Sequence, residues 1–270
     1  MLYAEYLSYL AIGIFCGFLS GLLGIGGGVV VVPTLFFCMQ YFAIESAHLM
    51  HLVIGTALSS MIFSTFASTW SHQKNHSLDK SLIAYMLPGL LAGAFLGAYF
   101  AKHLSSRVLE ILFGIFGCFI GLRFILQKKV ISSTQAPSCS LKWSYSFIGV
   151  GISFLSALLG VGGGIFSVPL LQSLKFPIKK AIATSSAITF FATLFASLCY
   201  FLLGLHQIHA AKLEHTSLGF IYLPAFFLIT PPSVALAFLG AKIAHRSSTT
   251  LLKRAFGIIL LFVGIYMLWG

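Results

Sequence analysis

Two uncharged runs of this sequence are too long to cross a lipid bilayer as single straight helices. Residues 6–44 and 143–174 contain no Lys, Arg, Asp, Glu or His. As α-helices they would extend about 58 Å and about 48 Å, at about 1.5 Å per residue. The hydrocarbon core of a bilayer is about 30 Å thick. Each run must therefore turn back within the membrane.

The turn is predicted at a glycine cluster that occurs once in each run. Gly24-Ile25-Gly26-Gly27-Gly28 is followed by Pro33, and Gly160-Val161-Gly162-Gly163-Gly164, 136 residues later, is followed by Pro169. Adjacent glycines disfavour a helix, so a break is expected there. A broken backbone in lipid is tolerated only where protein or a polar cavity satisfies it. Broken helices at corresponding places in two halves point to the binding site of a secondary transporter.

The composition is that of an all-α polytopic membrane protein. The 270 residues are 59% hydrophobic and 8% charged, whereas soluble domains carry about 25% charged residues. The first residues lack a basic segment and a cleavage site, so we expect no removable signal peptide. An eighth apolar segment, about 108–127, joins seven stretches without charge or histidine, at 6–44, 52–71, 81–101, 143–174, 181–205, 216–241 and 255–270.

The placement of Lys and Arg predicts the orientation of the chain. If both glycine runs fold back, thirteen of the 16 basic residues lie on one side, and only Lys102, Arg107 and Lys212 lie opposite. If all eight segments simply crossed the membrane, seven basic residues would lie on one side and nine on the other. The positive-inside rule favours the first arrangement, with the basic side cytoplasmic, in the cell inner membrane. Each half then crosses an odd number of times, which predicts two inverted repeats of about four apolar segments each. The net charge of +11 is explained by these loops, so nucleic acid is not an expected partner.

The boundary between the halves is expected at the polar connector 127–142, which is rich in turn-forming residues. It separates a first membrane repeat, 1–126, from a second, 143–270. The repeat extends beyond the glycines, because Ile54–Ser60 resembles Ile182–Ile188. Neither half could bury its broken helix alone, so we expect one integrated transmembrane domain.

The predicted site is formed by the helices that restart after each glycine triplet, near Val29 and Ile165. Their first amide N–H groups have no intrahelical acceptor and carry partial positive charge, which suits an anion. The alternative is that the glycines only allow close helix packing. Hydroxyls in the repeated segments are the second candidate, although such hydroxyls also bond to their own helix. The predicted substrate-binding residues are Gly26, Gly27, Gly28, Val29, Thr56, Ser59, Gly162, Gly163, Gly164, Ile165, Thr184 and Ser185.

Intramembrane carboxylates, which are typical of cation pathways, are scarce here, and this favours an anionic solute. Proton coupling would need His48, His51, His72 or Glu45, and the histidines are the main candidates because histidine titrates near physiological pH. The alternative is that these are solvated interfacial histidines. The five cysteines show no paired spacing, so we expect no metal site, no disulfide framework and no cofactor.

The chain resembles the TauE/SafE family, also called the sulfite exporter family or probable membrane transporter proteins. The resemblance rests on Gly21–Gly28 with Pro33, on its copy Ala157–Gly164 with Pro169, and on the segments around Thr56, Thr184, His72, Leu87-Pro88-Gly89 and Leu104–Arg107. It implies proton-coupled export or uptake of a small sulfur-containing anion, such as sulfite or sulfoacetate. Pro231-Pro232 departs from the family pattern and predicts a kink within 216–241.

The leading hypothesis is therefore a transporter of a small anion by alternating access, which is not an enzyme and whose partners are the solute and the lipid bilayer. Whether the chain forms a homo-oligomer is left open by the sequence. One alternative is an intramembrane hydrolase, because Gly17-Phe18-Leu19-Ser20-Gly21 resembles a nucleophilic serine among glycines. Ser156 repeats Ser20, however, and a second nucleophile would be unnecessary. The other alternative is an uncoupled anion pore. Nucleotide-binding motifs are absent from the sequence.

Overall fold

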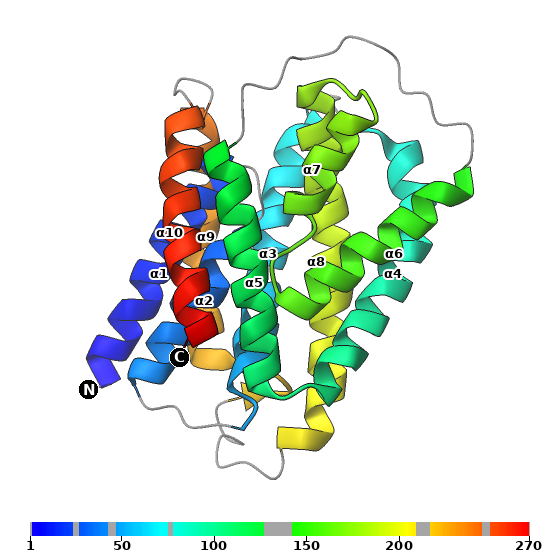
Figure 1. Cartoon of the computed structure of the whole chain (residues 1–270). Coiled ribbons are helices and arrows are strands. Elements are labelled where there is room, and N and C mark those ends of the chain that lie inside the picture. Colours follow the sequence, from blue (N-terminus) through cyan, green and yellow to red (C-terminus); the bar gives the residue numbers. More distant parts are fainter. Residues whose placement is uncertain are drawn as a thin grey trace.

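The computed structural model describes residues 2–23, 27–42, 47–74, 78–126, 142–208, 217–244 and 249–269 (Figure 1). These residues form helices and one hairpin of two short strands, with Ser217 paired to Tyr222. In chain order the elements are α1 Leu2–Leu23, α2 Gly28–Tyr41, α3 Leu49–Lys74, α4 Lys80–His103, α5 Ser106–Leu126, α6 Lys142–Leu159, α7 Gly164–Ser173, α8 Ile178–Ile208, β1 Ser217–Leu218, β2 Ile221–Tyr222, α9 Leu223–Ala244 and α10 Thr249–Trp269. The predicted all-α fold is confirmed.

Both long apolar runs break at their glycines, as predicted. α1 ends at Leu23 and α2 begins at Gly28, while α6 ends at Leu159 and α7 begins at Gly164. At about 1.5 Å per residue, α1 and α6 extend about 33 Å and about 27 Å, whereas α2 and α7 extend about 21 Å and about 15 Å. Each apolar run therefore consists of a first helix that has about the length needed to cross a bilayer and a second helix that is shorter.

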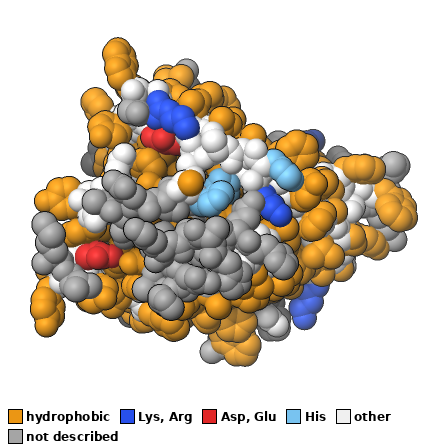
Figure 2. All heavy atoms as spheres, turned by 90° about the horizontal axis from the view of Figure 1, so that it is seen from below, with side chains coloured by type: hydrophobic (Ala, Val, Ile, Leu, Met, Phe, Trp, Pro, Cys, Tyr) orange, Lys and Arg blue, Asp and Glu red, His pale blue; other side chains and the backbone are white. Residues whose placement is uncertain are grey.

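The chain is a multi-pass membrane protein. Among the described residues, five helical segments are long and apolar enough to cross a bilayer, namely Tyr3–Gly21, Leu49–Ser71, Lys80–His103, Ser106–Leu126 and Lys180–Leu205. The remaining apolar helices are shorter. Figure 2, seen from below, shows apolar side chains over most of the described surface, with charged and histidine side chains only in scattered places. Exposed Phe and Leu side chains such as Phe119 and Phe262 suit contact with lipid.

The main helix pairs join the two halves of the chain. α1 packs along α9, α6 packs along α4, α5 packs along α10, and α3 and α8 contact each other. Glycines make the closest approaches: a Cβ atom on Gly93 would fall on the carbonyl oxygen of Val150, and one on Gly17 would fall on that of Ser233. Small residues allow such close packing in lipid. Each half thus supplies its broken first helix to the other half.

The two halves run in opposite directions in Figure 1. α1 begins and α10 ends at the lower end of the view, where α4 and α8 also end and α5 and α9 begin. At the upper end, α3, α7 and α9 end and α4, α8 and α10 begin. α4, which begins at Lys80, and α8, which carries Lys180 in its first turn, both begin at this upper end. The end of α4, with Lys102, and the start of α5, with Arg107, lie at the lower end.

α9 continues through Pro231 and Pro232 as one helix. The predicted kink therefore does not end the helix. Beside these prolines, α3 and α9 border an open groove of about 650 Å³. Its lining is almost entirely apolar and includes Phe63, Trp70 and Phe238. An apolar groove between helices that face the bilayer does not suit a small anion, so the candidate site lies elsewhere.

Candidate functional site

The two glycine breaks contact each other inside the protein. Gly28, the first residue of α2, lies so close to the second break that a Cβ atom on it would fall on the carbonyl oxygen of Gly160 and 2.8 Å from the carbonyl carbon of Val161. Gly28, Gly160 and Val161 are all buried. The start of α2 therefore lies against the residues that link the end of α6 to α7. That the first turns of α2 and α7 together form a site stays a prediction.

Positive φ angles explain why glycine is needed at the breaks. Gly27 has φ 81°, Gly160 has φ 70° and Gly162 has φ 74°. Other residues pay a steric penalty in this left-handed region. Gly163 has φ −70°, so it adopts an ordinary helical conformation, unlike its counterpart Gly27. The two breaks are therefore equivalent in position but not in local backbone geometry.

Each break leaves amide donors at the start of a helix. The Gly27 carbonyl accepts hydrogen bonds from the N–H groups of Val30 and Val31, at 2.9 Å and 3.0 Å. The Gly163 carbonyl accepts from Phe166 and Ser167 in the same way, at 3.1 Å and 2.9 Å. The amides that precede these residues lie in the first turn and have no acceptor within the helix. They belong to Gly28, Val29, Gly164 and Ile165, which are all predicted site residues and are all buried. Gly26 lies outside the described residues.

The hydroxyls of Thr56 and Thr184 bind backbone of the opposite half. Thr56 Oγ1 accepts a hydrogen bond from the Tyr222 N–H at 2.9 Å, just before α9. Thr184 Oγ1 accepts from the Asp79 N–H at 3.1 Å, just before α4. Thr56 of the first half thus binds the residue just before α9 of the second half, and Thr184 of the second half binds the residue just before α4 of the first half. This matching arrangement supports the equivalence of the segments around Thr56 and Thr184. One lone pair of each hydroxyl oxygen is used by a hydrogen bond within the protein.

Ser59 and Ser185 each pair with another serine. Ser59 Oγ donates to the Gly55 carbonyl and lies 2.7 Å from Ser197 Oγ of α8. Ser185 Oγ lies 2.6 Å from Ser167 Oγ of α7, and Ser167 Oγ in turn donates to the Gly163 carbonyl at 2.9 Å. Ser185 is therefore linked to the second glycine break through Ser167, whereas Ser59 links α3 to α8.

Three side chains beside the breaks were not among the predicted site residues. Met61 of α3 lies between the breaks: Cβ atoms on Gly28 and Gly162 would lie 2.7 Å from its Sδ and 2.5 Å from its Cε. Thr189 and Thr193 of α8 place their methyl groups next to Gly162, at 3.1 Å and 3.6 Å from such a Cβ. The helical spacing of Ser185, Thr189 and Thr193 on one face could have predicted the two threonines. A methionine in an apolar run gives no such signal.

Two buried serines on α6 have no partner. Ser153 Oγ and Ser156 Oγ are completely buried and make no hydrogen bond among the described residues. Ser156 lies one turn before the second break, because its carbonyl accepts from the Gly160 N–H at 2.9 Å. In the first half, Ser20 lies next to the other break, 3.2 Å from a Cβ placed on Gly27. A buried hydroxyl without a partner costs free energy, and a water molecule or a bound solute would satisfy it.

The predicted proton-coupling histidines lie away from the breaks. The ring centroids of His48 and His51 are 5.3 Å apart, and both rings contact Phe220. His51 Nε2 lies 2.8 Å from the Ala101 carbonyl oxygen, whereas its buried Nδ1 has no partner among the described residues. Met61 follows His51 by ten residues, or about 15 Å along the helix. The side chain of His72 lies outside the described set.

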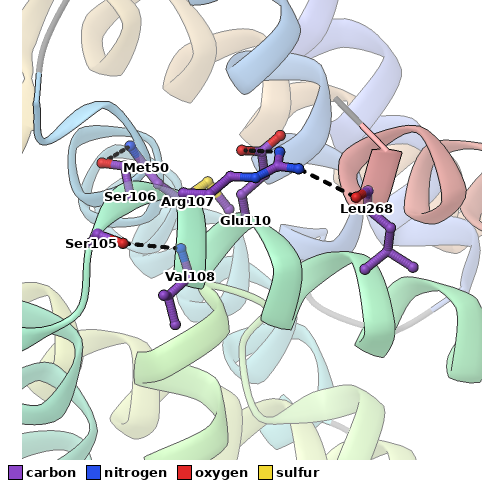
Figure 3. A network of polar contacts seen from close by, with 7 residues as sticks. All are labelled: Met50, Ser105, Ser106, Arg107, Val108, Glu110 and Leu268. Carbon is purple, nitrogen blue, oxygen red and sulfur yellow. Dashed lines mark hydrogen bonds and ion pairs between the residues drawn. The ribbon is translucent and has the colours of Figure 1, made fainter.

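Ionic contacts lie at the helix ends, away from the glycine breaks. Near the lower end, Arg107 Nη1 lies 3.1 Å from Glu110, and its Nη2 donates to the Leu268 carbonyl at 3.3 Å (Figure 3). Ser106 Oγ accepts from the Met50 N–H at 3.4 Å. This network joins α5 to α10 and to α3, so it stabilises the bundle. The candidate site itself is formed by amides, hydroxyls and one thioether.

Comparison with known proteins gives one family. The description "Sulfite exporter TauE/SafE" matches residues 9–267. A "Probable membrane transporter protein" of Haemophilus influenzae is 28% identical over 267 residues, covering 96% of this chain and 96% of its own length. Two further proteins with that description, from Methanocaldococcus jannaschii and Bacillus subtilis, are each 27% identical and cover 95% and 96% of this chain and 93% and 95% of their own lengths. No solved structure matches the chain.

Proposed function

Because the chain belongs to the sulfite exporter TauE/SafE family, we propose that it is a secondary transporter which moves a small anion across the cell inner membrane. The proposed cargo is a sulfur-containing oxyanion or an organosulfonate, as in sulfite or sulfoacetate. The contact between Gly28 and Gly160 is the observation that carries the proposal, because it brings the start of α2, whose first amides have no acceptor within the helix, against the buried residues that lead into α7. Amides at helix starts favour anions.

The chemistry around this contact supports an anion. No Lys or Arg side chain is needed there, since helix N-termini and hydroxyls both donate hydrogen bonds. Thr189 and Thr193 present their methyl groups to Gly162, because their hydroxyls donate to carbonyls of their own helix, and Ser156 Oγ is buried without a partner among the described residues. A dehydrated oxyanion needs several donors that converge on it, and the proposed donors are the helix-start amides of α2 and α7 and the Ser156 hydroxyl of α6.

The arrangement of the two halves supports a mechanism of alternating access. α1 packs on α9 and α6 packs on α4, so two helix pairs made from both halves flank the α3–α8 pair. We propose that these pairs rock around the glycine breaks, with the two halves as inverted repeats in the membrane. In this mechanism the breaks remain near the bilayer midplane, and access changes from one side to the other. His48 and His51 are the proposed groups for proton coupling.

Reconstitution into liposomes tests the function. Purified protein is expected to carry radiolabelled sulfite or sulfoacetate down a gradient, and an imposed pH gradient is expected to drive accumulation. The same anions are expected to raise the melting temperature, since a ligand of the folded state stabilises it. Taurine, sulfate and small carboxylates complete the panel. Flux that ignores the pH gradient would favour an uncoupled pore, and labelling of Ser20 by a serine-reactive probe would favour a hydrolase. If no anion of the panel gives either flux or stabilisation, the proposal is contradicted.

A further inference from the structure

Met61 occupies the space between the two glycine breaks. Its Sδ faces Gly28 of the first break and its Cε faces Gly162 of the second, and the side chain is 2% exposed. Both neighbours lack a side chain, and this is what gives the long thioether room. Met61 is therefore a side chain of α3 that contacts both glycine breaks, one at the start of α2 and the other just before α7.

Thr189 takes the corresponding place in the second half. Thr56 and Thr184 accept equivalent backbone hydrogen bonds, and Met61 and Thr189 each follow that threonine by five residues. Both reach Gly162, since a Cβ placed there would lie 2.5 Å from Met61 Cε and 3.1 Å from Thr189 Cγ2. Two equivalent positions thus lie beside Gly162. One presents a thioether, and the other presents the methyl group of a threonine whose hydroxyl donates to the Ser185 carbonyl at 2.8 Å.

We propose that Met61 is the specificity-determining residue of this site and makes one wall of it apolar. The inference rests on the proposed anion transport. A dehydrated oxyanion is held by donors, namely the helix-start amides, whereas the thioether can only pack against an apolar or polarizable part of the solute. Met61 therefore favours an anion with a charged end and an apolar end over a compact anion that is polar on all sides.

The surroundings of Met61 allow it to move. Its carbonyl oxygen accepts hydrogen bonds from Thr65 Oγ1 at 2.7 Å and from Ser64 Oγ at 3.1 Å, both from the next turn of α3. Hydroxyls that bond back to a helix carbonyl favour bending of the helix. Methionine is unbranched and adopts many side-chain conformations. The thioether can thus withdraw from the breaks when a solute enters and return when it leaves.

The test compares two isosteric variants, Met61→Val and Met61→Thr. Both leave the same extra space, but only threonine adds a hydroxyl, the group that the second half already has at position 189. The measurement is flux of sulfite and of ethanesulfonate into liposomes, given as a ratio for each variant. Elution volume and melting temperature confirm that each variant is folded.

The expected result is a shift of about tenfold toward sulfite in Met61→Thr relative to Met61→Val, because a hydrogen bond to a charged group changes affinity by about that factor or more. Met61→Val is expected to keep or increase the preference of the unmodified protein for ethanesulfonate. Equal ratios in the two folded variants would overturn the role of Met61 while leaving the transport function intact. Absence of flux for both anions in the unmodified protein would instead overturn the transport function, and the role of Met61 with it.

Discussion

The carboxylate of Asp79 lies 2.9 Å from the ammonium of Lys180, and the two residues belong to opposite halves of the chain. Asp79 is also the N-cap of α4, since its side chain accepts a hydrogen bond from the Leu82 N–H at 3.1 Å. Its own N–H donates to Thr184. One acidic residue therefore joins the start of α4 to the start of α8 at the upper end of Figure 1.

Two substitutions separate the roles of Asp79. Asn caps helices as well as Asp does, so Asp79→Asn is expected to lose only the ion pair, which is worth less than about 1 kcal/mol at this exposure. Asp79→Ala is expected to lose the cap as well, at a further cost of about 1 kcal/mol. Melting temperatures in detergent should fall in the order unmodified, Asn, Ala. Equal melting temperatures for all three would show that neither contact contributes to stability.

The pH dependence of stability follows from the same residue. Partial burial of Asp79 disfavours its charged form, but the hydrogen bonds from Lys180 and from the Leu82 and Ser81 N–H groups outweigh this, and the pKa is lowered. A lowered pKa in the folded state gives stability that is present above the unfolded pKa, about 3.9, and is lost as the pH falls through the folded pKa. The difference in melting temperature between the unmodified protein and Asp79→Asn should be constant from about pH 5 to 7 and shrink below about pH 4. A difference that grows on acidification would contradict this assignment.

Alanine at Gly28 is expected to separate the two glycine breaks. The new methyl group would fall on the Gly160 carbonyl oxygen and 2.7 Å from Met61 Sδ. Overpacking of this kind costs about 1–3 kcal/mol, and the anion site would lose its geometry. Anion flux should therefore be lost, with a lower melting temperature. Gly151→Ala on α6 is the matched control, because a Cβ there meets nothing within 4 Å. Normal flux in Gly28→Ala would show that the contact between the breaks is not the site.

Valine at Thr56 or Thr184 tests whether these hydroxyls bind the solute or only stabilise the fold. Each substitution keeps the shape but removes the acceptor of a backbone N–H, at an expected cost of about 1–3 kcal/mol. If the role is structural, Thr56→Val should lower the melting temperature without changing the affinity for the anion. Serine at the same positions should restore stability. A variant that retains its melting temperature but binds the anion tenfold more weakly would instead support the predicted role in substrate binding.

Cysteine labelling tests the membrane orientation. With the native cysteines replaced by alanine, Glu45→Cys is expected to react with an impermeant reagent from outside the cell, and Lys175→Cys only after permeabilisation. This is the outcome of a chain that turns back at Gly24–Gly28 and again at Gly160–Gly164. Labelling of both positions from the same side would contradict the thirteen-to-three distribution of basic residues as a guide to orientation.

The breaks could be predicted from sequence because they depend on local properties. Glycine triplets disfavour a helix wherever they occur, and the length of an uncharged run can be compared directly with the thickness of a bilayer. The partners of Thr56 and Thr184 could not be predicted in the same way. Their hydroxyls accept from backbone N–H groups 166 and 105 residues away, and sequence patterns do not show which of many distant donors a hydroxyl will meet.

The difference in backbone conformation between the two breaks could not be predicted from the sequence either. Gly27 and Gly163 occupy equivalent positions, but Gly27 has a positive φ and Gly163 does not. Backbone conformation at a glycine depends on what surrounds it, because glycine itself accepts both regions. Met61 was missed for a different reason. In an uncharged run a methionine looks like any other packing residue, and only the positions of Gly28 and Gly162 reveal what it fills.

The exchange of helices between the halves has a consequence for biosynthesis. Gly89 and Gly93 of α4 lie against the backbone of α6, which is made only after the connector. While the ribosome is still translating that connector, this face of α4 has no helix to cover it, and α1 likewise waits for α9. The nascent first half must therefore be retained near the insertion machinery, or shielded by lipid, until translation of the second half supplies the missing surfaces.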